Sequence, residues 1–87
     1  MTKLEQKLVD LGYYRNKNIK TKYHKDFKSD PFIYITIELN INSTEILDYW
    51  VRNDNNFRIS YDFNITKELF NEMESDVEIL KEVEENE

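Results

Sequence analysis

The middle of this 87-residue chain alternates strictly between apolar and polar residues, and this constrains its fold most. Ile or Leu stands at every second position from 33 to 41, and residues 47–51 and 57–63 repeat the alternation after turn-forming Asn, Ser, Thr and Asp residues. Successive side chains of a strand point to opposite faces of a sheet, so this period predicts three antiparallel strands with one buried face. A fourth strand is expected at 20–27, where many Lys residues suit a sheet edge.

The buried face also predicts how strands 33–41 and 47–51 pair. Three cross-strand pairs keep the apolar residues together, namely Leu39 with Leu47, Ile37 with Tyr49 and Ile35 with Val51. A one-residue slip would move every side chain to the other face, so this register needs a loop of three or five residues between the strands. It places Trp50 opposite Thr36 and Tyr34 opposite Arg52 on the outer face, where Trp50 also neighbours Arg58.

A helix is predicted at each end of the chain. The first spans about residues 2–11, because Thr2-x-x-Glu5 is a capping-box pattern and Gly12 suits the left-handed position after a helix. The last begins near Thr66 as N-cap and carries an apolar stripe that includes Leu69, Phe70, Met73, Val77 and Leu80. The sequence therefore predicts a single α+β domain, residues 1–83. Residues 84–87 form an acidic tail that we expect to fray.

The predicted order is helix, four strands, helix. Short loops favour an antiparallel meander, and both helices must bury their apolar stripes on one sheet face. With no cysteine, the chain has neither a disulfide framework nor a thiolate metal site. The N-terminus shows no apolar signal region, so we expect a cytoplasmic protein.

Residues that could carry catalysis are few. His24, the only histidine, is expected to lie exposed on an edge strand, without the partner that a catalytic base needs. Three outer-face carboxylates, Glu38, Asp48 and Asp62, lack the set of oxygen ligands that a calcium site requires. We therefore expect no enzymatic activity, no metal and no cofactor.

Charge is distributed unevenly along the chain. The net charge is −6, yet residues 1–28 carry +5 and residues 29–87 carry −11. The predicted last helix presents the acidic residues Glu68, Glu72, Glu74, Glu78 and Glu82. Such a run is either a solvated helix face or an imitation of a phosphate backbone that fits a basic groove.

Two further surfaces are candidates for binding. Trp50 with Tyr34, Arg52 and Arg58 has the composition of a binding hot spot, unless another segment or a second copy of the chain covers it. The basic segment 15–28 is the alternative, a nucleic-acid-binding surface that uses the residues Lys17, Lys20, Lys22, Lys25 and Lys28.

Residues 4–13, Leu-Glu-Gln-Lys-Leu-Val-Asp-Leu-Gly-Tyr, are similar to the start of small prophage proteins of low-GC Gram-positive bacteria. Phe70, Met73, Asp76 and Leu80 extend the resemblance to the last helix. This group of phage accessory proteins includes inhibitors of host defence such as anti-CRISPR proteins. The resemblance implies a protein-binding role without catalytic residues, with a host or phage protein as the partner.

Overall fold

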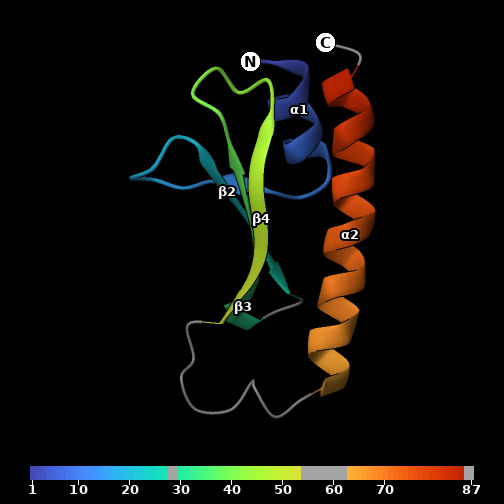
Figure 1. Ribbon diagram of the computed structural model, residues 1–87. Coiled ribbons are helices and arrows are strands. Elements are labelled where there is room, and N and C mark those ends of the chain that lie inside the picture. Colours follow the sequence, from blue (N-terminus) through green and yellow to red (C-terminus); the bar gives the residue numbers. More distant parts are fainter. Residues whose placement is uncertain (28–29, 54–62, 86–87) are drawn as a thin grey trace.

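The computed structural model describes residues 1–27, 30–53 and 63–85 (Figure 1). Its elements follow the order α1 (Lys3–Asp10), β1 (Tyr14–Arg15), β2 (Lys22–Phe27), β3 (Asp30–Leu39), β4 (Ile46–Asn53) and α2 (Phe63–Glu85). Within the described residues the strands form one four-stranded antiparallel sheet, β1-β2-β3-β4, so the α-β-β-β-β-α meander is confirmed. No described helix has both the length and the apolar character that a membrane crossing demands.

The four strands are not the four that the alternation predicts. The strand expected at the edge, 20–27, is the interior strand β2, because the two-residue strand β1 pairs along its outer side. The register there aligns Tyr14 with His24 and Arg15 with Tyr23. Of the strand expected at 57–63, residues 57–62 lie outside the described residues, and Phe63 begins α2.

The pairing of β3 with β4 follows the predicted register over most of its length. Ile37 lies opposite Tyr49, and Ile35 lies opposite Val51. At the loop end the register shifts, and Leu39 pairs with Ile46 instead of Leu47. The buried face therefore selected the register, as expected, for all but the last pair.

A β-bulge explains the shift and corrects the expected loop length. Six residues, 40–45, separate β3 from β4, and the Asn40 amide donates to the Glu45 carbonyl at 2.9 Å. An even loop would place Asp48 on the buried face. The bulge adds Leu47 as an extra residue on β4 and restores the alternation, since two residues then oppose one. Ile46 packs against the core in its place, and Leu47 is 60% exposed.

Helix α1 begins with the predicted capping box. The Thr2 hydroxyl accepts a hydrogen bond from the Glu5 amide at 3.1 Å, and the Glu5 carboxylate accepts one from the Thr2 amide at 2.8 Å. Thr2 also donates its hydroxyl hydrogen to the Ser43 carbonyl at 2.7 Å. The cap therefore joins the start of α1 to the β3–β4 loop.

The end of α1 turns the chain into the sheet. Gly12 has a φ of +98°, in the left-handed region, and follows the C-cap Leu11. The amides of Gly12 and Tyr13 donate to the carbonyls of Val9 and Leu8 at 3.0 and 2.9 Å, the two bonds of a Schellman motif. Tyr13 then enters the core, where it is 3% exposed.

Both helices cover the same face of the sheet, and α2 runs along its whole length (Figure 1). The core between the layers consists of Leu4, Leu8, Tyr13, Tyr23, Phe27, Ile33, Ile35, Ile37, Leu39, Leu69, Met73, Val77 and Leu80. Helix α2 begins three residues before the expected cap, Thr66, and continues to Glu85. Glu84, expected to fray, is half-buried, and its carboxylate accepts a hydrogen bond from the Ile46 amide at 3.1 Å.

Replacing Gly12 tests the turn after α1. Gly12→Ala should lower the free energy of unfolding by about 1–2 kcal/mol, because a side chain disfavours the left-handed backbone. The added Cβ would meet only Lys25 Cε, at an ordinary 3.7 Å, so backbone strain dominates the cost. Gly12→Asn should cost less, because Asn adopts this conformation more readily. Urea unfolding of both variants measures the difference, and equal losses would contradict this account.

Candidate functional site

The acidic face of α2 is the first candidate surface. All five predicted residues, Glu68, Glu72, Glu74, Glu78 and Glu82, are exposed. At 3.6 residues per turn, Glu78 and Glu82 lie on the side of α2 opposite the buried stripe, Glu68 and Glu74 lie to either side of them, and Glu72 lies nearest the sheet. The apolar core therefore fixes the rotation of α2 so that these carboxylates are exposed to solvent.

The surroundings of Glu72 differ from those of Glu74 and Glu78. Glu72 approaches Lys25 Nζ at 3.5 Å, which partly neutralises it. Glu74 and Glu78 form no ion pair with the described residues. They line a hollow of about 470 Å³ between α2 and β4, together with Tyr49 and Lys81. Lys81 Nζ lies 5.9 Å from the centre of the Tyr49 ring, so this hollow already holds one cation of the chain itself.

The outer face of the sheet is the second candidate. One row of register neighbours crosses all four strands, Tyr14, His24, Thr36 and Trp50. Trp50 is half-buried, and Lys22 Nζ lies 5.4 Å from the centre of its ring. The alternation within β2 could have predicted this contact, because it places Lys22 and His24 on the outer face, where Trp50 also lies.

His24 is held more firmly than the sequence predicts. Its Nδ1 lies 2.9 Å from the Thr36 hydroxyl, and its Nε2 lies 2.9 Å from the side-chain amide nitrogen of Asn16. An amide nitrogen only donates, so Nε2 accepts and Nδ1 carries the proton, which assigns the neutral ring from its hydrogen bonds. The expectation of an exposed edge-strand histidine is wrong, because β1 and Asn16 cover this side of β2.

Of the other three predicted hot-spot residues, the structure describes Tyr34 and Arg52. Tyr34 lies opposite Arg52 in the predicted register, and its ring meets the His24 ring edge-on at 5.3 Å between centres. Arg52 is exposed. Arg58 lies outside the described residues. Trp50, Tyr34 and Arg52 thus share the outer face, and α2 covers the opposite face.

The basic segment does not act as one surface. Lys25 points to the inner face, where its Nζ donates to Asp76 at 3.0 Å. Lys22 stacks on Trp50, and Lys28 lies outside the described residues. Lys17 and Lys20 are exposed on the β1–β2 hairpin, which projects from the sheet on the side away from α2 (Figure 1).

Asp76, which the sequence singles out only as part of the resemblance, is a buried carboxylate. It is 6% exposed and accepts from the Tyr13 hydroxyl at 2.9 Å as well as from Lys25. Burial, together with the Asp76 charge, raises the pKa of Tyr13 well above its usual range. The hydrogen bonds that Tyr13 and Lys25 donate to the Asp76 carboxylate therefore hold α2 against the sheet.

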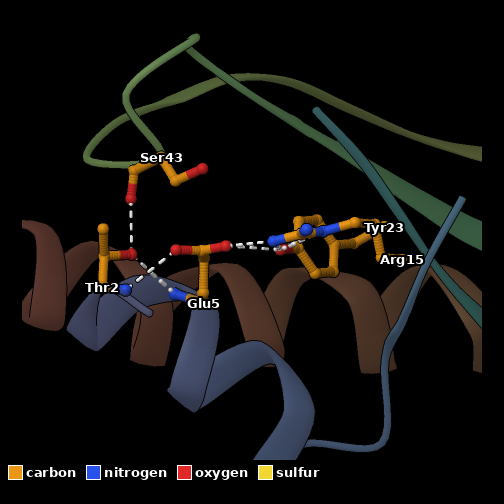
Figure 2. Close-up of polar contacts among 5 residues, drawn as sticks. All are labelled: Thr2, Glu5, Arg15, Tyr23 and Ser43. Atoms are coloured by element: carbon orange, nitrogen blue, oxygen red, sulfur yellow. Dashed lines mark hydrogen bonds and ion pairs between the residues drawn. The ribbon is translucent and has the colours of Figure 1, made fainter. Parts of the chain in front are cut away.

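Glu5 is the second buried carboxylate (Figure 2). It accepts from the Thr2 amide, from the Tyr23 hydroxyl at 3.0 Å and from the Arg15 guanidinium. The Thr2 amide is the largest cause of the lowered pKa of Glu5, which burial opposes and Tyr23 and Arg15 reinforce. A general acid at neutral pH needs a raised pKa, so this carboxylate is suited to structure.

Several polar side chains of the described residues are buried or lie opposite one another in the sheet. No buried side-chain nitrogen or oxygen among them lacks a hydrogen-bond partner. No group of three His, Asp or Glu side chains in that part of the chain is placed to hold a metal ion. Glu38 and Asp48 lie opposite each other, with Lys22 opposite Glu38 on its other side.

Acid titration tests the role of Glu5. A carboxylate with a lowered folded pKa stabilises the protein fully above the pKa of the unfolded chain and loses this effect as pH falls through the folded pKa. Glu5→Gln should therefore cost about 1–3 kcal/mol at pH 7, and the deficit should shrink below about pH 4.5. Urea unfolding at pH 7 and pH 3 measures this. The exposed Asp10→Asn is the control, and a deficit that does not change with pH would refute the assignment.

Comparison with family models, with curated proteins and with solved structures found no match to this chain. The proposals below therefore rest on the geometry of the described residues and on the resemblance noted in the sequence.

Proposed function

We propose that this protein is a non-catalytic binding protein that inserts the acidic face of α2 into the basic groove of a nucleic-acid-handling protein. The observation that carries the proposal is the solvent-facing row of carboxylates on a helix whose rotation is fixed by the core. Fixed negative charge at regular spacing is what a basic groove recognises in nucleic acid.

The spacing of the charges supports imitation of a phosphate strand. Glu68 and Glu82 are fourteen residues apart, which is about 21 Å along a helix. Five exposed carboxylates over this length give roughly one charge every 5 Å, compared with about 3.4 Å along one strand of duplex DNA. The two linear densities are close enough for lysines and arginines of one groove to meet either ligand.

The rigidity of α2 is the second support. Leu69 and Leu80 are fully buried, and Met73 and Val77 are 4% exposed, so the helix is anchored along its length. A ligand that is already ordered loses less conformational entropy on binding than a flexible acidic tail does. Phosphates of a duplex are similarly preordered, and a helix anchored in this way shares that advantage.

The hollow beside Tyr49 supplies an anchor for the partner. Glu74 and Glu78 give it two carboxylates, and Tyr49 gives it a ring face that attracts cations. An arginine or lysine of the partner, on displacing Lys81, would meet both charge and ring. Hot spots of interfaces are commonly such pockets, where an aromatic residue and a buried charge meet.

The resemblance to phage accessory proteins narrows the partner class. A phage protein that blocks a nucleic-acid-binding groove would act in the host cytoplasm, on a nuclease or a defence complex. By their register, Trp50 and Tyr34 lie on the sheet face opposite the one that carries the buried core residues Ile35 and Ile37. We therefore assign them to a separate surface and not to the groove that receives α2.

A competition experiment tests this proposal. Immobilised protein incubated with host-cell lysate at low salt should retain nucleic-acid-binding proteins, and excess duplex DNA should release them, because both ligands occupy one groove. Raising the salt should also release them, since screening weakens contacts between exposed charges. Glu74→Gln with Glu78→Gln should weaken retention roughly tenfold, the scale of a hot-spot loss.

The matched control removes two charges elsewhere. Asp10→Asn with Glu45→Gln changes the net charge equally, at exposed positions outside α2. Its retention should stay close to that of the wild type. Equal losses in the two double variants, or retained proteins that duplex DNA cannot release, would overturn the proposal.

A further inference from the structure

A hollow on the outer sheet face lies where the β1–β2 hairpin meets the sheet. Its volume is about 380 Å³, and its lining includes Tyr14, Asn16, Lys17, His24 and Tyr34. These residues come from three strands and one loop, so the fold assembles them and no short sequence motif announces them. The proposed function does not use this side of the molecule.

The rings of the hollow are fixed and partly open to solvent. Tyr14 is 50% exposed, and its ring centre lies 5.7 Å from that of His24. Its hydroxyl donates to the Asp26 carboxylate at 2.9 Å, which sets the ring orientation. Burial and this bond raise the pKa of Tyr14 to about 12, so the phenol stays neutral near pH 7. A neutral aromatic ring that is held in one orientation and is partly exposed can stack against another flat ring.

The β1–β2 loop, which borders the hollow, is ordered by hydrogen bonds and carries exposed lysines. The Asn16 side-chain oxygen accepts hydrogen bonds from the amides of Asn18 and Ile19 at 2.8 and 2.9 Å, which shapes the turn. Of the five Lys and Arg residues in 11–25, Arg15 pairs with Glu5 and Lys25 with Asp76, so the local charge of the loop comes from the other lysines. Lys17 and Lys20 are exposed there, and Lys17 borders the hollow. We therefore expect a ligand of this hollow to place its anionic groups at the hairpin end, beside these lysines.

The acidic face of α2 does not cancel this local charge. Its carboxylates lie on the inner side of the sheet, on a helix about 10 Å in diameter, and all five are exposed there. The Debye length at physiological salt is about 8 Å, so they are largely screened from the outer face. Glu38 and Asp48 are nearer, on the same face, at the register row beside Trp50. They repel phosphates from that end and leave the hairpin end as the favourable one.

We propose that this hollow binds single-stranded nucleic acid, with a base stacked against Tyr14 and Tyr34 and the adjoining phosphates on Lys17 and Lys20. Stacking rings beside a row of cations are how proteins hold single strands without reading their sequence. A duplex hides its base faces inside the stack and would use only the lysines. An acidic peptide offers charge to Lys17 but no flat ring to the two tyrosines.

Fluorescence anisotropy of labelled single strands tests the proposal with the full chain. A ten-nucleotide strand at low salt should bind, and a duplex of equal length should bind more weakly. Tyr34→Leu should weaken binding of the single strand roughly fivefold or more, the scale of one lost stacking contact. Tyr14→Leu, at a half-exposed position, is the second variant if Tyr34→Leu fails to fold, as checked by circular dichroism.

Salt dependence separates the phosphate contacts. Lys17→Gln with Lys20→Gln should reduce the slope of log K against log salt by up to about 1.4, which corresponds to two phosphates. Lys3→Gln with Lys67→Gln removes two exposed cations elsewhere and should leave the slope unchanged. Glu74→Gln with Glu78→Gln should also leave binding unchanged, so this result is independent of the test on α2.

Four outcomes would overturn the proposal. They are no binding at low salt, binding that both tyrosine variants leave intact, binding of polyglutamate as tight as that of the strand, and binding of a free mononucleotide as tight as that of the strand. Light scattering of the free protein adds a fifth, because a stable dimer closed over this face would leave no room for the strand.

Discussion

The contact on which both surfaces depend is the buried carboxylate of Asp76 between the helix layer and the sheet. It accepts from Tyr13 at the start of the sheet and from Lys25 on β2, so α2 has only one rotation that satisfies it. Leaving such a carboxylate unpaired would cost several kcal/mol, more than most single apolar contacts contribute. The same contact determines which charges remain available. It removes Lys25 from the basic segment and holds Lys25 Nζ 3.5 Å from Glu72, which partly neutralises one carboxylate of the acidic face.

The features that the sequence predicted are those that short-range chemistry decides. The capping box of Thr2 and Glu5 and the left-handed Gly12 each depend on neighbours within five residues, so the pattern and the structure agree. The β3–β4 register was also predictable, because one buried face admits one parity. The bulge at Leu39 was not, since an odd loop and an even loop with a bulge satisfy the same alternation.

The candidate sites were less predictable, for a physical reason. A strand of two residues, Tyr14 and Arg15, is too short to show a period, yet it converts β2 from an edge into an interior strand. That change partly covers His24 and creates the hollow beside it. The helical period alone predicts that the glutamates of α2 are exposed. The pairing of Lys25 with Asp76 was not, because it joins residues 51 positions apart.

The sheet also explains how one small chain keeps opposite charges apart. With net +5 in residues 1–28 and −11 in the rest, an unfolded chain would draw its ends together, and a poorly ordered one would neutralise its own binding surfaces. In the fold, the β1–β2 hairpin, which carries Lys17 and Lys20, projects from one side of the sheet, and α2 lies on the other (Figure 1). The glutamates of α2 are exposed there. More than a Debye length of protein separates the two groups, so each acts on its surroundings nearly independently. If the proposed function holds, a charge distribution of this kind would orient the molecule as it approaches its partner, with the acidic helix towards the basic groove.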